Sequence, residues 1–272
     1  MSTEGTEHAT RPQPGNRPGW RAVAVPTEHG GWGLTAEPIL LGLLIAPSIA
    51  GLCLGAATML AFLVRSPLRV LLVDRHRHRT LDRTRLAGRI ALAEVALLLA
   101  LVTAAAATSP HPFWWPVIAA APLVGVESWF DARSRSRRLV PELAGAIGVS
   151  AAAAVIVVAA GHDTTEAVGA WLILAARSVT AIPYVRDQIA RLHHRSTTPR
   201  LLVLADSAAV ALAGIAVAVS PVFLAGATAV VVVIAAQRIT ARTAVPAKVL
   251  GIRQSVLGGL VVAATALGVH LA

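Results

Sequence analysis

This chain of 272 residues contains one cysteine, few charged side chains and no long hydrophobic run in its first 25 residues. Cys53 alone excludes an intramolecular disulfide, and no CxxC or zinc-site spacing is present. Residues 1–25 are polar and rich in proline, glycine, threonine and glutamate. They lack the apolar core of a signal peptide, so we expect a disordered tail followed by one domain over 26–272.

Apolar residues dominate the rest of the chain. Hydrophobic residues make up 56% and charged residues 14%, with a mean hydropathy of +0.68. Repeated apolar runs of bilayer length predict an all-α integral membrane protein. The net charge of +10 does not predict nucleic-acid binding, because the arginine clusters lie between apolar spans and lack interleaved aromatic residues. We expect them to face anionic lipids of the bilayer.

Basic residues are missing from four connections between apolar stretches, around Gly51, 109–112, 161–166 and 220–221. All 24 Lys and Arg residues fall instead in five clusters that separate pairs of apolar stretches. This asymmetry follows the positive-inside rule. It predicts a protein of the bacterial cytoplasmic (inner) membrane whose tail is cytoplasmic.

The number of crossings follows from helix geometry. Residues 34–64 would form one helix of about 46 Å at about 1.5 Å per residue, too long for a hydrocarbon core of about 30 Å. Two crossings joined by a turn fit better. The same reasoning predicts nine transmembrane helices and an extracytoplasmic carboxyl terminus, with spans at about 34–50, 52–73, 88–108, 114–131, 140–160, 166–184, 201–219, 222–237 and 250–272.

Polar residues inside spans are costly in hydrocarbon and normally face the bundle interior. In the fourth span Glu127, Asp131, Arg135 and Arg138 have the spacing of one helix face. They form either an ion-pair ladder that neutralises itself or one wall of a cytoplasm-facing polar cavity.

Other candidate ligand-binding residues lie toward the predicted cytoplasmic ends of neighbouring spans. Ser66-Pro67 is expected to bend the second span between two of them, and Glu142 also suits a helix amino terminus. The candidates are Arg65, Arg69, Glu142, Arg177, Tyr184, Arg186 and Asp187. Three further acids inside spans, Glu37, Glu94 and Asp206, are expected to be paired structurally.

The most distinctive local string, residues 26–33, precedes the first span. A neutral histidine beside an acid can act as a base or a phosphate ligand, which makes Glu28 and His29 catalytic candidates together with Asp131. Trp32 marks the membrane interface and is a candidate ligand contact. Alternatively, the glycines form a re-entrant bend and His29 satisfies a backbone carbonyl, and composition alone favours this simpler interpretation.

The chain resembles the YwiC-like integral membrane proteins of bacteria. The residues that carry the resemblance are Pro26, Glu28-His29-Gly30-x-Trp32, Pro38 and Gly42, Arg65-x-Pro67, and Tyr184-Val185-Arg186. The resemblance would extend from residue 26 to the end of the chain. It implies a multi-pass inner-membrane protein whose activity is undefined.

The predicted topology is also similar to that of UbiA-type intramembrane prenyltransferases. Those enzymes hold Mg²⁺ and a prenyl diphosphate with two Asp-rich motifs, and hard cations need such oxygen ligands. Here the corresponding regions offer only the weak metal candidates Asp74 and Asp82, among arginines, and Asp187 alone. We therefore expect no metal cofactor, with Mg²⁺ relevant only if the chain is a divergent member of that group.

Two functions from different classes remain open. In the first, a cytoplasm-facing cavity binds an anionic or isoprenoid lipid whose phosphate is held by arginines at 65, 69, 135 and 186 through bidentate contacts. An enzymatic version would be a prenyltransferase with degenerate Asp motifs. The alternative is a transporter or permease for a small anion or lipid. The sequence leaves the substrate and the oligomeric state open.

Overall fold

The computed structural model describes residues 29–78, 81–133, 138–241, 243 and 245–272. These residues form helices joined by short connections, and no strand occurs among them. The all-α fold class is confirmed. In chain order the helices are α2 (His29–Ile45), α3 (Ile49–His76), α4 (Asp82–Thr108), α5 (Trp114–Ala132), α6 (Leu139–Ala159), α7 (Thr164–Leu192), α8 (Pro199–Val219), the 3₁₀ turn η1 (Pro221–Phe223), α9 (Leu224–Thr240) and α10 (Ala247–Leu271).

Seven helical segments in this part of the chain are long and apolar enough to cross a membrane: α3, α4, α6, α7, α8, η1 with α9, and α10. The apolar part of α2, Gly31–Ile45, is shorter, and α5 is not one of the seven. The expected crossings are thus supported for these seven segments. Crossing by α2 and α5 stays a prediction.

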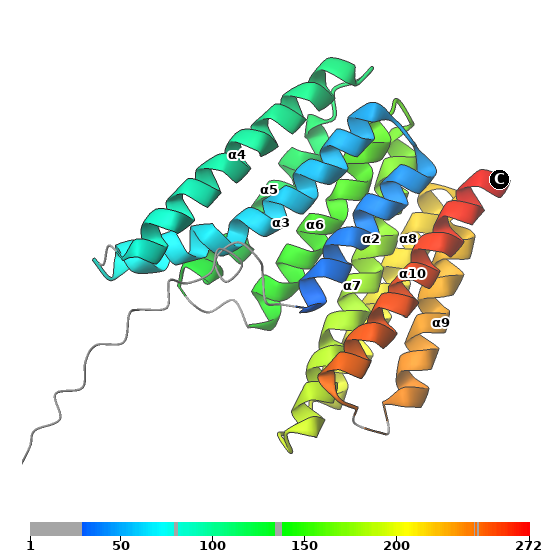
Figure 1. Ribbon diagram of the computed structural model, residues 1–272. Helices are drawn as coiled ribbons and strands as arrows, with labels where there is room; N and C mark the ends of the chain where they lie inside the picture. Colours follow the sequence, from blue (N-terminus) through cyan, green and yellow to red (C-terminus); the bar gives the residue numbers. More distant parts are fainter. Residues whose placement is uncertain (1–28, 79–80, 134–137, 242, 244) are drawn as a thin grey trace, which may run out of the picture.

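The connections gather at two ends of the bundle (Figure 1). At one end, Ser109 Oγ donates to the carbonyl of Ala159 (2.9 Å), and His270 Nε2 lies 2.7 Å from the carbonyl of Leu44. The connections there, 46–48, 109–113, 160–163 and 220, contain no Lys or Arg. The other end, called the basic end below, holds the start of α2 and the connections after α3, α5, α7 and α9.

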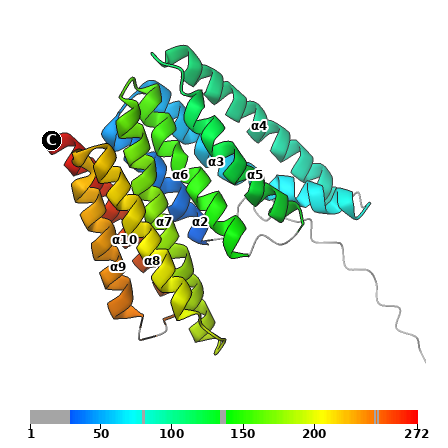
Figure 2. The same cartoon turned by 180° about the vertical axis from the view of Figure 1, so that it is seen from behind.

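Helices α6 and α7 form the centre of the bundle. Of the membrane-length segments they are the most buried, at 78% and 72%, whereas α4 is 11% buried and lies at one edge (Figures 1 and 2). The apolar core is rich in alanine, because small side chains let helices approach closely. Gly42 and Gly51 lie against Ile156 of α6, where an added Cβ would come within 3.0 Å of that side chain.

The start of α2 differs from the expectation for the glycine-rich string. The helix begins at His29, so Gly30 and Gly31 lie inside α2 and do not form a re-entrant bend. A Cβ on Gly31 would lie 2.7 Å from the ring of Phe62 on α3. Gly31 therefore provides room for close packing of two helices rather than a turn.

Helix α3 continues through Pro67 as a helix of 28 residues. Proline removes one backbone donor and crowds the preceding turn, and the last part of α3, cyan in Figure 1, takes a different direction from its first part. Ser48 is the N-cap of α3, since its side chain accepts a hydrogen bond from the Gly51 N–H at 2.9 Å. The expected bend near Ser66-Pro67 thus lies inside one long helix.

Candidate functional site

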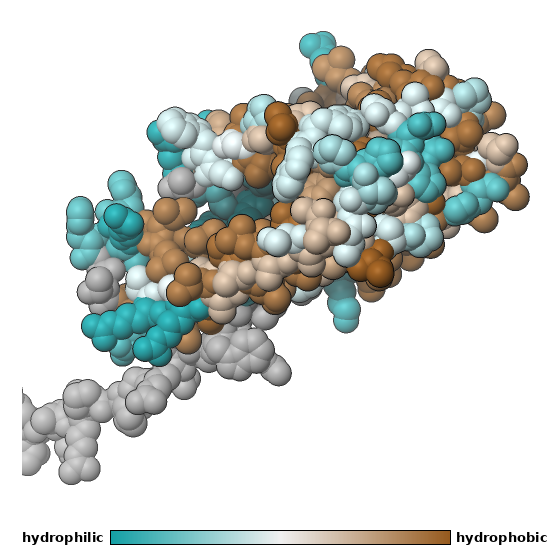
Figure 3. Space-filling model, turned by 90° about the horizontal axis from the view of Figure 1, so that it is seen from above, coloured by the Kyte–Doolittle hydropathy of each residue, from teal (hydrophilic) through white to brown (hydrophobic). Residues whose placement is uncertain are grey.

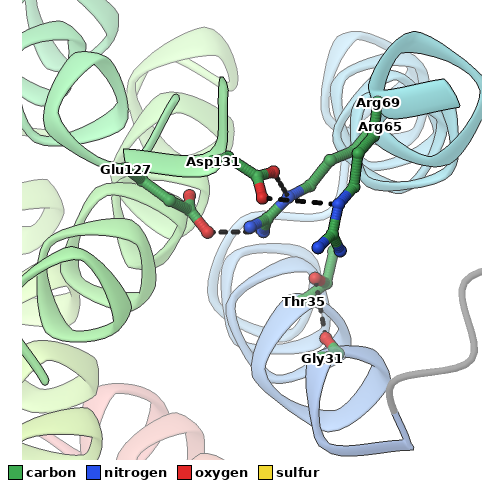
Figure 4. Close-up of polar contacts among 6 residues, drawn as sticks. All are labelled: Gly31, Thr35, Arg65, Arg69, Glu127 and Asp131. Atoms are coloured by element: carbon green, nitrogen blue, oxygen red, sulfur yellow. Dashed lines mark hydrogen bonds and ion pairs between the residues drawn. The ribbon is translucent and has the colours of Figure 1, made fainter. Parts of the chain in front are cut away.

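Two arginines of α3 meet two carboxylates of α5 at the basic end of the bundle (Figure 4). Arg65 donates from Nε to Asp131 Oδ2 at 2.8 Å and from Nη1 to Glu127. Arg69, one turn further along α3, lies with its Nε 3.9 Å from Asp131 Oδ1. These four residues are called the α3–α5 cluster below. Its two hydrogen bonds join residues that are 66 and 62 positions apart in the sequence.

Neighbouring helices hold the cluster in place. A Cβ on Gly145 of α6 would lie 2.2 Å from the carboxyl carbon of Glu127, so this glycine makes room for the acid. On α2, Trp32 packs edge-on against Phe62, with ring centroids 5.2 Å apart. Phe62 lies one turn before Arg65, so the start of α2 flanks the cluster.

The cluster is partly open to its surroundings. The arginine side chains are 35% and 46% exposed and the carboxylate side chains 18% and 12%. Exposed apolar side chains of α3, Leu68 and Leu72, lie within one turn of Arg69, and the face seen in Figure 3 carries hydrophilic and apolar residues side by side. Such an arrangement suits an amphiphile, because a charged group and an apolar chain find matching surfaces close together.

Further candidate ligand-binding residues lie on α6 and α7. Arg186 Nη1 donates to Glu142 Oε2 at 2.7 Å, and Arg191 Nε donates to Asp187 Oδ2 at 2.6 Å. The buried Tyr184 hydroxyl lies 3.0 Å from Thr240 Oγ1 of α9. The contacts of Arg186 and Tyr184 thus tie α7 to α6 and α9.

Arg177 occupies the interior instead. It is 1% exposed, lies near the middle of α7, and donates from Nη2 to the backbone carbonyl of Gln254 on α10 at 2.8 Å. The same Nη2 lies 3.7 Å from Glu37 Oε1 on α2. Glu37 is therefore paired, as expected for the acids inside spans.

A polar line runs from this interior pair to the surface between α8 and α9. The sequence does not predict that these residues meet, since they come from different helices. Gln237 donates to Gln254 Oε1 at 3.4 Å. The Thr180 hydroxyl lies 2.7 Å from Asp206 Oδ1 and 3.0 Å from Gln237 Oε1, and Arg238 Nε donates to Asp206 Oδ2 at 2.7 Å. It ends at an open groove of about 360 Å³ lined by Val203, Asp206, Ser207, Val210 and Arg238.

The remaining acids differ in their hydrogen-bond partners. Asp74 accepts from Arg83 at 2.8 Å and from Thr84 at 2.6 Å, and Asp82 starts α4. Glu94 has a buried Oε2 without a hydrogen-bond partner among the described residues. In the same ranges, no group of three His, Cys, Asp or Glu side chains could hold a metal ion.

Some candidates lie outside the described residues. Glu28 and Arg135 fall in undescribed segments, and for His29 the structure describes the backbone alone. Their roles stay predictions.

Comparison with known proteins gives a match for part of the chain. No match is found among curated proteins or among solved structures. The family model described as YwiC-like protein matches residues 25–159. That region contains the string around Trp32, the first two spans and the whole α3–α5 cluster, whereas Tyr184-Val185-Arg186 lies beyond it. The chain is a multi-pass membrane protein that is similar to the YwiC-like family over residues 25–159.

Proposed function

We propose that this protein binds a lipid with a phosphate-containing headgroup at the α3–α5 cluster, on the cytoplasmic side of a bacterial inner membrane. The supporting observation is that Arg65 and Arg69 point from α3 toward α5 with side chains that are 35% and 46% exposed (Figure 4). Planar guanidinium groups recognise phosphate oxygens by pairs of N–H donors. The acyl or isoprenoid chain would lie along exposed apolar side chains of α3 such as Leu68 and Leu72.

Orientation is part of this proposal. The amino terminus is cytoplasmic and the carboxyl terminus extracytoplasmic, with α2 and α5 crossing alongside the seven membrane-length segments. The gathering of basic residues at one end of the bundle supports it, because Lys and Arg concentrate in cytoplasmic loops. The partners are thus the bilayer and an anionic or isoprenoid lipid rather than nucleic acid.

A phosphate can enter the cluster by competing with the carboxylates already there. The contact between Arg69 and Asp131 is long, at 3.9 Å, and the Arg69 side chain is nearly half exposed. This distance is beyond that of a hydrogen bond. A charge-assisted phosphate contact can therefore compete with this pair for Arg69.

Metal-dependent prenyl transfer has weaker support. Asp74 is held by Arg83 and Thr84, and Asp187 is held by Arg191. Carboxylates occupied in this way do not fit a pair of Mg²⁺–diphosphate motifs, so we derive no catalytic step through a metal. The proposal concerns binding of the lipid.

Binding of farnesyl diphosphate and of phosphatidylglycerol to the purified protein tests the proposal, by calorimetry with and without Mg²⁺. We expect Arg65→Gln/Arg69→Gln to weaken binding by at least about tenfold, or about 1.4 kcal/mol. The matched control is Arg75→Gln/Arg77→Gln, which removes the same charge from the exposed end of α3.

Equal losses in the two double variants would show that only general electrostatic attraction acts, and would contradict the proposal. Absence of binding of both lipids to the unaltered protein would contradict it as well.

The alternative, transport of a small anion or lipid, is favoured by one observation. Arg177 and Glu37 form a charged pair deep in the bundle, and intramembrane ionisable residues often mark transport pathways. Flux of labelled anions into proteoliposomes, with the unaltered protein and with Arg177→Gln, tests this alternative.

A further inference from the structure

The Arg177 side chain lies near the middle of α7, away from both ends of the bundle. It is roughly 20 Å from each end of α7, at about 1.5 Å per residue, and 1% of it is exposed. An isolated buried charge is expensive unless it is paired and hydrogen-bonded. The groups around Arg177 therefore determine whether its charge is compensated.

The guanidinium has more N–H donors than the described residues supply acceptors for. Arg177 donates from Nη2 to the Gln254 carbonyl, and the Glu37 carboxylate, at 3.7 Å from the same nitrogen, is beyond hydrogen-bond distance. Nε and Nη1 are buried without any partner among the described residues. The side-chain nitrogen of Gln254 is also buried without an acceptor.

Nearby acceptors contact other groups. Gln254 Oε1 accepts from Gln237, and the Thr180 hydroxyl lies 2.7 Å from Asp206 Oδ1 and 3.0 Å from Gln237 Oε1. The Glu37 carboxylate lies tightly against Gly258 of α10, where an added Cβ would be 1.8 Å from Oε1. Glu37 is thus confined by the helix that also carries Gln254.

We propose that Arg177 and the Gln254 amide form a binding site for a small carboxylate or oxyanion at the centre of the bundle. Such an anion supplies the acceptors that Nε, Nη1 and the amide nitrogen lack, and guanidinium groups bind these anions by paired N–H donors. Glu37 is the internal carboxylate that competes with the anion for Arg177. The site uses α2, α7 and α10 and does not rest on lipid binding at the α3–α5 cluster.

A chain of hydrogen bonds connects the site with the surface between α8 and α9. It runs through Gln237, Thr180 and Asp206 to the groove, where Arg238 pairs with Asp206.

Thermal unfolding of the purified full-length protein tests this site, with sodium acetate, sodium nitrate or inorganic phosphate added at constant ionic strength. A ligand that binds only the folded state raises Tm in proportion to its occupancy. We expect at least one of the three anions to raise Tm in a saturable way. Arg177→Gln should abolish this shift, whereas Arg195→Gln, an exposed change just after the same helix, should preserve it.

Two more variants keep the test decisive if Arg177→Gln does not fold. Glu37→Gln removes the competing charge and should tighten anion binding by about tenfold. Gln254→Glu places a carboxylate on the residue that already contacts Arg177, so the variant should lose the anion response. Arg65→Gln/Arg69→Gln should keep the response, which separates this site from the proposed lipid site.

The proposal is overturned if none of the three anions raises Tm, or if Glu37→Gln and Gln254→Glu respond like the unaltered protein. A response that disappears in Arg65→Gln/Arg69→Gln but remains in Arg177→Gln would also overturn it, because the anion would then bind at the α3–α5 cluster.

Discussion

At the scale of single residues, two carboxylates of this protein lie directly against glycines of a neighbouring helix. Glu127 of α5 packs on Gly145 of α6, and Glu37 of α2 packs on Gly258 of α10. Glycines let membrane helices approach closely. The structure shows that Gly145 and Gly258 each also make space for an acid that pairs with an arginine.

Gly258→Ala should destabilise the protein by about 1–3 kcal/mol, the usual cost of overpacking. The new methyl group would overlap Glu37 Oε1, and Glu37 has little room to move because it is buried. Denaturant unfolding of the purified protein measures this loss. The next residue provides a control, since Gly259 has no atom within 4 Å of an added Cβ.

Gly259→Ala should leave stability unchanged or raise it by about 0.5–1 kcal/mol, because alanine suits a helix interior better than glycine. Equal losses at 258 and 259 would contradict close packing of Glu37 on α10.

At the scale of helices, α3 determines where the candidate lipid site lies. Its length, the bend near Pro67 and the one-turn spacing of Arg65 and Arg69 bring both guanidinium groups toward α5 (Figure 4). The sequence predicted the helix, its bend and the shared face of Glu127 and Asp131, because each depends on local spacing. It did not predict that Arg65 is their partner, since that contact depends on how α3 and α5 pack.

The ion pairs between α3 and α5 should couple the two helices energetically. A double-mutant cycle with Arg65→Gln and Asp131→Asn, measured by unfolding in detergent, should give a coupling energy within about 0.5–3 kcal/mol. Arg85→Gln, an exposed change on α4, should alter stability by no more than about 0.5 kcal/mol. A coupling energy near zero would mean that apolar packing alone holds α5 in place.

At the scale of the whole molecule, the two ends of the bundle differ in charge. The lysines and arginines cluster along the chain so that every second connection lacks them. Contacts such as His270 with Leu44 and Ser109 with Ala159 place the uncharged connections and the carboxyl end together. The fold thus gathers into one surface what the sequence presents as separate clusters.

The proposed orientation predicts which connections are reachable from each side of the membrane. In a Cys53→Ser background, Thr165→Cys near the start of α7 should react with a membrane-impermeant maleimide in intact spheroplasts. Ser196→Cys, in the connection after α7, should react only after permeabilisation. Both positions are exposed, so the opposite labelling pattern would reverse the proposed orientation.

The sequence by itself determined which segments are apolar helices and which connections carry positive charge, because hydropathy, helix length and charge are properties of neighbouring residues along the chain. Tertiary structure alone decided which charged groups meet. Arg65 forms ion pairs with Glu127 and Asp131, and Arg186 forms one with Glu142. Arg177 donates a hydrogen bond to the Gln254 carbonyl and lies near Glu37. These partners lie on different helices, and the packing of small residues between the helices sets their distances.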